Sequence, residues 1–209
     1  MYPSATWKER FADGIVHIIG LILAAATCAA LLIWSADNHG PALFWACVVY
    51  AVSIIISCGI SAAYHQLPKH EWRFWMRKVD HAAIYLVIAG TMSPLLVLVG
   101  TSSALWILAA IWIFATIGVA FKLFGNNMDS RWSLASYLGL GWFGLLAMPD
   151  FYAALPTGAL IAIGGGAVLY TVGALFYRNK QLRYRYAIWH AVGLCGAMSF
   201  FAANWISLF

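Results

Sequence analysis

The chain has few charged residues and few cysteines, and each shortage excludes a class of protein. Only 9% of its residues are charged and 64% are hydrophobic, so a water-soluble globule of this composition would lack polar surface. The four cysteines form no C-x-x-C pair, which argues against a disulfide framework and a cysteine metal site. The net charge of +5 gives no support of its own for nucleic-acid binding, and anionic lipid headgroups are its natural counter-charge.

Long apolar runs dominate the sequence instead. A helix that crosses the hydrocarbon core of a bilayer needs about 20 mostly apolar residues. The runs that meet this requirement predict seven spans, at residues 14–35, 41–64, 81–99, 104–124, 132–148, 157–177 and 186–208. The connections are short and carry turn signals such as Gly125-Asn126-Asn127 and Pro149-Asp150. We therefore predict an all-α polytopic membrane protein whose residues 1–209 form a single seven-helix bundle.

The first apolar run is predicted to be a span and not a cleaved signal peptide. It is longer than the roughly 7–15 apolar residues of a signal sequence. Glu9, Asp13 and His17 also place polar groups at its entrance. The N-terminal run therefore counts as the first helix of the bundle.

The basic residues predict how the bundle lies in the membrane. In a seven-span arrangement, all 12 lysines and arginines fall on one side: Lys8, Arg10, Lys69, Arg73, Arg77, Lys78, Lys122, Arg131, Arg178, Lys180, Arg183 and Arg185. Loops rich in Lys and Arg stay in the cytoplasm. The N-terminus is therefore predicted to be cytoplasmic and the C-terminus to lie on the other side.

Four polar residues on separate spans lie within about two helical turns of the predicted cytoplasmic side: His17, His65, Asp80 and His190. Asp13 and His17 are spaced i, i+4, as are Ser61 and His65, so each pair projects from one side of its helix. Ionisable groups inside a membrane usually face the bundle interior. A histidine near the interface can also simply contact headgroups or cap a helix, and for any single histidine this reading is at least as good.

Taken together, His65, Asp80 and His190 favour a metal site. Neutral imidazole is the commonest metal ligand in proteins, and zinc in catalytic sites keeps one position open for water. Zinc lowers the pKa of that water to about 7, so that hydroxide can attack an amide or ester carbonyl. A nearby carboxylate can orient the water.

Five motifs, in order along nearly the whole chain, resemble the bacterial hemolysin III family of the progestin and adipoQ receptor (PAQR) superfamily. They are ERFADGIVHIIG at 9–20, SAAYH at 61–65, KVDHAAIYLVIAGTMSP at 78–94, GGAVLYTVGALFY at 165–177 and AIWH at 187–190. The resemblance implies a seven-helix protein of the bacterial cytoplasmic membrane with a cytoplasmic N-terminus.

The resemblance also implies a zinc site near the cytoplasmic face. Family zinc is held by one histidine of the second helix and two of the seventh, with an aspartate of the third holding a water. By motif, His65 is the second-helix ligand, His190 is one seventh-helix ligand and Asp80 is the aspartate. Ser61 matches a serine one turn before the ligand and would bond water or substrate.

The seventh helix departs from the family pattern H-x-x-x-H, because Tyr186 stands in the place of the first histidine. The loss of one nitrogen donor would weaken zinc binding. His17 or His81 could replace the missing ligand, and Tyr186 itself could serve only as a phenolate.

Two functions of different classes follow as hypotheses. The first is a zinc-dependent hydrolase that acts on a lipid amide or ester, such as a ceramide-like amide, with Asp80 and Ser61 in catalytic roles. The second is a non-enzymatic membrane protein that senses or adjusts the lipid state of the bilayer. Pore formation has little support, because no polar stripe runs along the spans from one face to the other.

Overall fold

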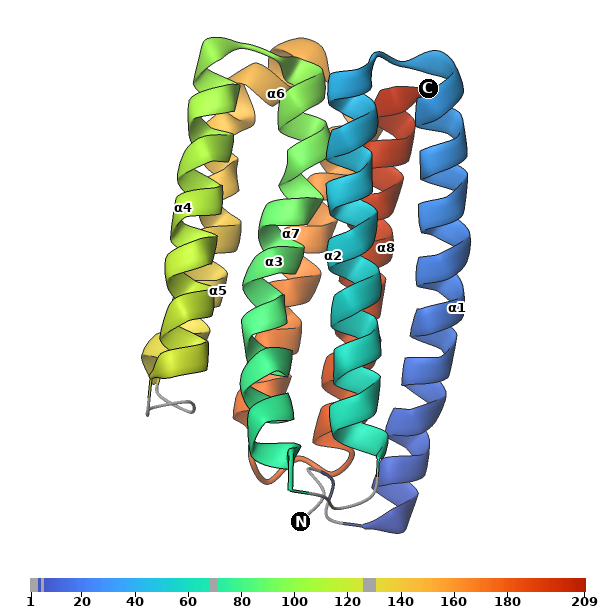
Figure 1. Cartoon of the computed structure of the whole chain (residues 1–209), viewed down its shortest axis with the longest axis vertical. Coiled ribbons are helices and arrows are strands. Elements are labelled where there is room, and N and C mark those ends of the chain that lie inside the picture. Colours follow the sequence, from blue (N-terminus) through green and yellow to red (C-terminus); the bar gives the residue numbers. More distant parts are fainter. Residues whose placement is uncertain (1–3, 5, 68–70, 126–130) are drawn as a thin grey trace.

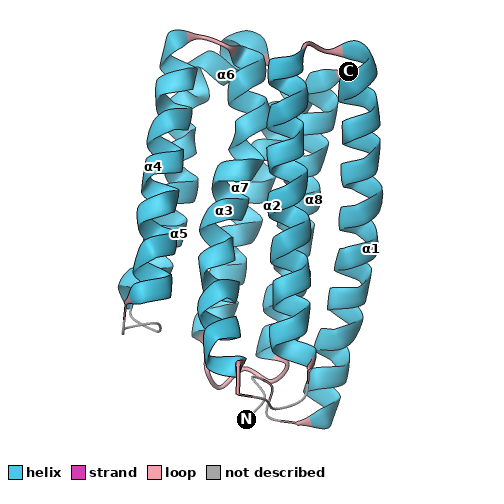
Figure 2. Cartoon of the chain, viewed as in Figure 1, coloured by secondary structure: helices cyan, strands magenta, loops and turns pink. Residues whose placement is uncertain are grey.

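The structure is a computed structural model that describes residues 4, 6–67, 71–125 and 131–209, with the side chains of 131 and 132 left out. The described residues form helices and no strand (Figure 2). The helices are α1 (Trp7–Asn38), α2 (Pro41–Gln66), α3 (Arg73–Val99), α4 (Ser102–Phe124), α5 (Arg131–Phe143), the 3₁₀ helix η1 (Gly144–Ala147), α6 (Met148–Ala154), α7 (Thr157–Arg178) and α8 (Arg185–Leu208). The all-α prediction is confirmed. Asn126, Asn127, Lys69 and the Arg131 side chain lie outside the described residues.

Six helices of the described chain are long and apolar enough to cross a membrane: α1, α2, α3, α4, α7 and α8. The segment predicted as a fifth span at 132–148 is divided among α5, η1 and α6. Pro149 explains part of this division, because proline lacks an amide hydrogen and clashes with the carbonyl one turn earlier, at Leu145. The Met148 amide bonds that same Leu145 carbonyl in a 3₁₀ turn. Pro149-Asp150 was expected to be a loop; this is wrong, since the pair opens α6.

The connections of the bundle alternate between its two ends (Figure 1). The starts of α1, α3, α5 and α8 and the ends of α2, α4 and α7 lie at one end, which we call the basic end. The α1–α2, α3–α4 and α6–α7 connections and the C-terminus lie at the other, the far end. The lysines and arginines of the described residues lie in or next to these helix ends, so they share one end of the bundle, as the sequence predicted.

Helix packing divides the interior into two hydrophobic cores. One lies between α1 and α2 and includes Leu31, Cys47 and Tyr50. The other joins α3 and α4 to α6 and α7, and Phe151 is fully buried in it. Cys28 and Cys47 are buried hydrophobes, as expected, whereas Cys195 is exposed. Helix α1 packs against α2 and α8, and these three helices carry the site described next.

Close approach of α7 and α8 depends on glycine. A Cβ atom added at Gly166 would lie 2.6 Å from the ring of Phe200, and one added at Gly173 would lie 3.1 Å from Trp189. Small residues let helix backbones approach within a bilayer, where lipid tails provide no hydrophobic driving force for association. The close packing of α7 on α8 therefore fixes the position of α8, which carries His190.

Candidate metal centre

The first turn of α1 is fixed by a capping box. Thr6 is the N-cap: its hydroxyl accepts the amide hydrogen of Glu9, and the Glu9 carboxylate accepts the amide hydrogen of Thr6 at 2.9 Å. This arrangement satisfies amide donors that a helix start leaves without partners. Helix α1 therefore begins at Trp7, several residues before the predicted span, and Asp13 lies within regular helix.

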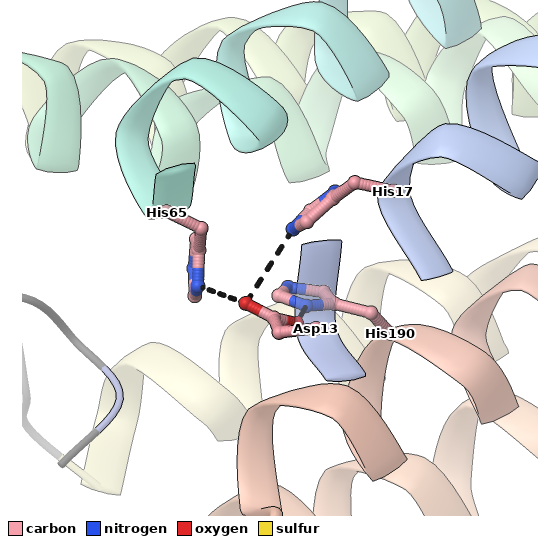
Figure 3. Close-up of side chains that lie close together, drawn as sticks. All are labelled: Asp13, His17, His65 and His190. Carbon is pink, nitrogen blue, oxygen red and sulfur yellow. Dashed lines mark hydrogen bonds and ion pairs between the residues drawn. The ribbon is translucent and has the colours of Figure 1, made fainter. Parts of the chain in front are cut away.

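Three helices bring four side chains together (Figure 3). Helix α1 supplies Asp13 and His17 from one face, the last turn of α2 supplies His65, and α8 supplies His190. One possible ligand atom from each of the four residues lies within 4.8 Å of the other three. Among the described residues, these four form the group that could hold a metal ion. The imidazole centroids lie 4.5 Å apart for His17 and His190 and 4.6 Å apart for His65 and His190.

Asp13 is the centre of this group. Its side chain is fully buried, and each carboxylate oxygen accepts a hydrogen bond from a different imidazole. His65 Nδ1 donates to Oδ2 at 2.9 Å and His190 Nδ1 donates to Oδ1 at 2.7 Å. A carboxylate in apolar surroundings is costly unless it is paired and hydrogen-bonded. These two imidazoles supply that pairing.

His17 is held differently. Its Nε2 atom lies 3.8 Å from Asp13 Oδ2, beyond hydrogen-bonding distance, and it is buried with no hydrogen-bond partner among the described residues. A buried polar atom without a partner is rare in folded proteins and calls for an explanation. A cation shared with the neighbouring donors would satisfy this nitrogen.

The four donors suit a zinc-like ion in number and kind. Zinc takes imidazole nitrogen and carboxylate oxygen at about 2.0–2.2 Å, which sets tetrahedral ligand atoms about 3.3–3.6 Å apart. His65 Nδ1 and His17 Nε2 lie 2.9 Å and 3.8 Å from Asp13 Oδ2. These distances bracket that spacing, although His65 Nδ1 would have to lose the hydrogen that it donates to Asp13 before it could bind an ion. The donor set therefore fits a metal ion of the kind that the sequence predicted.

A cavity of about 270 Å³ borders the group. It extends from His17, His65 and His190 along the inside of the bundle, and its wall is mostly apolar, with Met92 and Phe200 among its lining residues. Ser61, Asp80, His81 and Tyr186 line the same cavity. A pocket with an apolar wall and a few polar groups at one place is typical of small-molecule sites.

The structure brings together His65 and His190 of the predicted ligands and adds His17, one of the proposed replacements. Asp80 and His81 are not in the four-residue group. His81 Nδ1 donates to the Arg77 carbonyl oxygen at 2.8 Å and lies 3.8 Å from Asp80 Oδ2. The ligand role of Asp80 and the catalytic roles of Asp80 and Ser61 stay predictions.

Tyr186 lies beside the group and outside it. Its ring packs edge-to-face on His65, with centroids 5.1 Å apart, and its hydroxyl accepts a hydrogen bond of 2.8 Å from the Arg185 guanidinium. The hydroxyl is thus already engaged by a cation. Tyr186 supports the His65 ring, and the third imidazole of the group comes from α1.

Asp13 is the one residue of the group that the sequence did not predict as a ligand. Its i, i+4 spacing from His17 was the available signal, since that spacing places both side chains on one helix face. The spacing does not tell which way the face turns. That depends on how α1 packs against α2 and α8.

These features define a class: a multi-pass helical membrane protein with a buried carboxylate–imidazole group beside an internal cavity. Comparison with known proteins narrows the class. The Haemolysin-III related family matches residues 5–201. Hemolysin-3 of Bacillus cereus is 37% identical over 199 residues, covering 93% of this chain and 90% of the relative. The Hemolysin-3 homolog of Bacillus subtilis (strain 168) is 33% identical over 201 residues, covering 94% and 92%. The chain belongs to the hemolysin III family of the PAQR superfamily. No solved structure matches it.

Proposed function

We propose that this protein is a zinc-dependent hydrolase that acts on an amide or ester bond of a membrane lipid. The observation that carries the proposal is the contact between the four-residue group and the apolar cavity, which share His17, His65 and His190. The cavity wall suits the hydrocarbon part of a lipid. The polar groups gathered at one end of the cavity suit the bond that is cleaved.

Each residue of the site has a separate role in the proposed hydrolysis. His17, His65 and His190 would hold the ion and leave one position open for water, and Asp13 would orient the His65 and His190 rings through its two hydrogen bonds. When bound, zinc supplies a water acidic enough to provide hydroxide near neutral pH. Asp80 and Ser61 line the cavity beside the imidazoles, where a carboxylate can accept the water's proton and a hydroxyl can bond the substrate carbonyl. The apolar wall excludes bulk water from the site.

We also propose that the basic end faces the cytoplasm of a bacterium and that the chain lies in its cytoplasmic membrane, N-terminus inside. The gathering of lysines and arginines at one end of the bundle supports this orientation. The lipids of the inner leaflet would then be the substrates and the principal partners.

A lipid-cleavage assay on the purified protein tests the proposal. Ceramide and a phospholipid ester are supplied in mixed micelles, and released fatty acid is measured for wild type, His65→Ala and Asp80→Asn. The matched control is His39→Ala, which removes a histidine at the far end of the bundle. The proposal expects wild type and His39→Ala to release fatty acid at equal rates and the other two variants to release none. No release by metal-loaded wild type from either lipid contradicts it.

A non-enzymatic membrane protein is the second candidate, and one observation favours it. Four protein donors fill a tetrahedral zinc shell, and zinc sites closed in this way are structural. Such an ion would fasten α1 to α2 and α8 and would leave no position for water. The visible absorption of cobalt-substituted protein separates the two functions. Bands that shift when azide is added indicate an exchangeable position and support the hydrolase, whereas unchanged bands support the structural role.

A further inference from the structure

One face of α1 carries acidic and imidazole groups at regular intervals. Glu9, Asp13 and His17 are spaced i, i+4, i+8, so they lie one above another on the helix. Helices α1 and α8 both start at the basic end and run toward the far end, and they pack against each other (Figure 1). Each contact from this face of α1 to α8 therefore helps to fix how far one helix slides along the other.

Two hydrogen bonds cross from this face to α8 or to its first residues. Asp13 Oδ1 accepts the 2.7 Å bond from His190, within the candidate metal centre. Glu9 Oε1 accepts the backbone amide hydrogen of Tyr184 at 3.1 Å, at the start of α8. The helix rise is about 1.5 Å per residue. A slip of one residue would therefore displace Asp13 along His190 by about 1.5 Å and would lengthen and misalign the short bond between them.

Tyr184 is a sensitive place for such a contact. It is the N-cap residue of α8, its side chain makes no capping hydrogen bond, and its φ of 56° lies in the left-handed region. A non-glycine residue in that region carries strain that the surroundings must offset. The Glu9 carboxylate accepts the backbone amide hydrogen of Tyr184, so it stabilises both the left-handed turn at Tyr184 and the start of α8.

The two oxygens of Glu9 have separate tasks. Oε2 accepts the amide and hydroxyl hydrogens of Thr6, both at 2.9 Å, which caps α1. Oε1 alone bonds Tyr184. Capping is thus confined to one oxygen and the link to α8 to the other, and variants can separate the two.

We infer that Glu9 is a positioning residue for the metal centre: through Tyr184 it sets the register of α1 against α8, and so the approach of Asp13 and His17 to His190. The inference rests on the metal binding of the proposed function. Groups that orient metal ligands without touching the ion typically change metal affinity by 10–100-fold when they are removed. We expect a loss of this size from Glu9→Ala.

The test compares zinc affinities, measured by competition with a chromogenic chelator on protein in detergent, with thermal unfolding followed in parallel. Thr6→Ala is the matched control, because it damages the same helix cap and leaves the Glu9–Tyr184 bond in place. We expect a loss of at least about tenfold for Glu9→Ala, in the range for ligand-orienting groups, and less than about twofold for Thr6→Ala. Glu9→Gln keeps an oxygen acceptor for Tyr184 and should retain most of the affinity.

The outcomes are distinct. If Glu9→Ala and Thr6→Ala lost zinc affinity equally, and in proportion to their fall in unfolding temperature, Glu9 would act only as a capping residue. That result would overturn the inference. Zinc binding by wild type that Glu9→Ala leaves unchanged would overturn the inference alone. Wild type that binds no zinc would overturn the inference and the proposed metal centre together.

Discussion

The two ends of the bundle use the same residue types differently. At the far end, Asp150 accepts hydrogen bonds from Thr101 and Ser103, both 2.8 Å, at the start of α4, and His39 Nε2 bonds the Leu208 carbonyl oxygen at 3.1 Å. At the basic end, Asp13 is fully buried and three imidazoles converge on it. Far-end groups complete helix ends near the surface. Basic-end groups meet inside the bundle, and His17 Nε2 is left without a hydrogen bond there.

The comparison shows that residue type alone does not mark a functional site. An aspartate and a histidine within a turn of a span end occur at both ends. Convergence from three helices, burial and an unsatisfied donor atom separate the basic end from the far end. The first three predictions below compare the two ends, and the last one tests the basic end alone.

The largest expected effect concerns orientation and is all or none. In a Cys195→Ser background, which removes the exposed native thiol, Lys180→Cys places a thiol at the basic end and Asn38→Cys places one at the far end. A membrane-impermeant maleimide added to intact cells should label Asn38→Cys and leave Lys180→Cys unlabelled until the cells are opened. The reverse pattern would invert the proposed topology.

Loss of a central ligand should have the next largest effect. His65→Ala should reduce bound zinc from about one ion per chain to background, since a single structural or catalytic site takes one ion. His39→Ala, at the far end, should keep the wild-type content. Elemental analysis of the purified variants measures both, and equal zinc in the two variants would remove His65 from the site.

Stability of the metal-free protein should also differ between the ends. Asp13→Ala leaves two imidazole donors unpaired, that of His65 buried and that of His190 half-buried, and should lower the free energy of unfolding by about 2–4 kcal/mol. Asp150→Ala weakens only the hydrogen bonds beside the Thr101 cap and should cost about 0.5–1 kcal/mol. Denaturant unfolding in detergent with a chelator present compares them. A larger loss of unfolding free energy for Asp150→Ala than for Asp13→Ala would contradict the central role of Asp13.

The smallest effect is expected from restoring the family pattern. Tyr186→His should change zinc affinity by less than about threefold, about 0.6 kcal/mol, because His17 already provides the third imidazole. In a His17→Ala background the same substitution should recover much of the lost affinity. A large gain from Tyr186→His in the otherwise wild-type chain would mean that His17 does not bind the ion.

Much of the fold could be predicted from the sequence because bilayer thickness imposes long apolar helices. All six qualifying helices correspond to predicted spans. The start of α1 was placed too late because hydropathy reports the apolar run and ignores the Thr6–Glu9 capping box, although the sequence carries that signal. The division of the predicted fifth span, residues 132–148, depends on local backbone geometry around Gly144 and Pro149. Hydropathy contains no information on that geometry.

The candidate site was only partly predictable. Motif and depth pointed to His65 and His190, and the departure at Tyr186 raised His17 as a replacement. Asp13 bonds His190 across 177 residues of sequence, and this pairing is decided by the rotation of α1 against its neighbours. A spacing rule within one helix contains no information on that rotation.

The central claim is that His17, His65 and His190 hold one metal ion between α1, α2 and α8. An anomalous-scattering map at the zinc absorption edge, from crystals of zinc-loaded protein, tests it most directly. We expect a single strong peak about 2 Å from a nitrogen of each imidazole. A map with no peak among these three histidines, or with its only peak elsewhere, would contradict it.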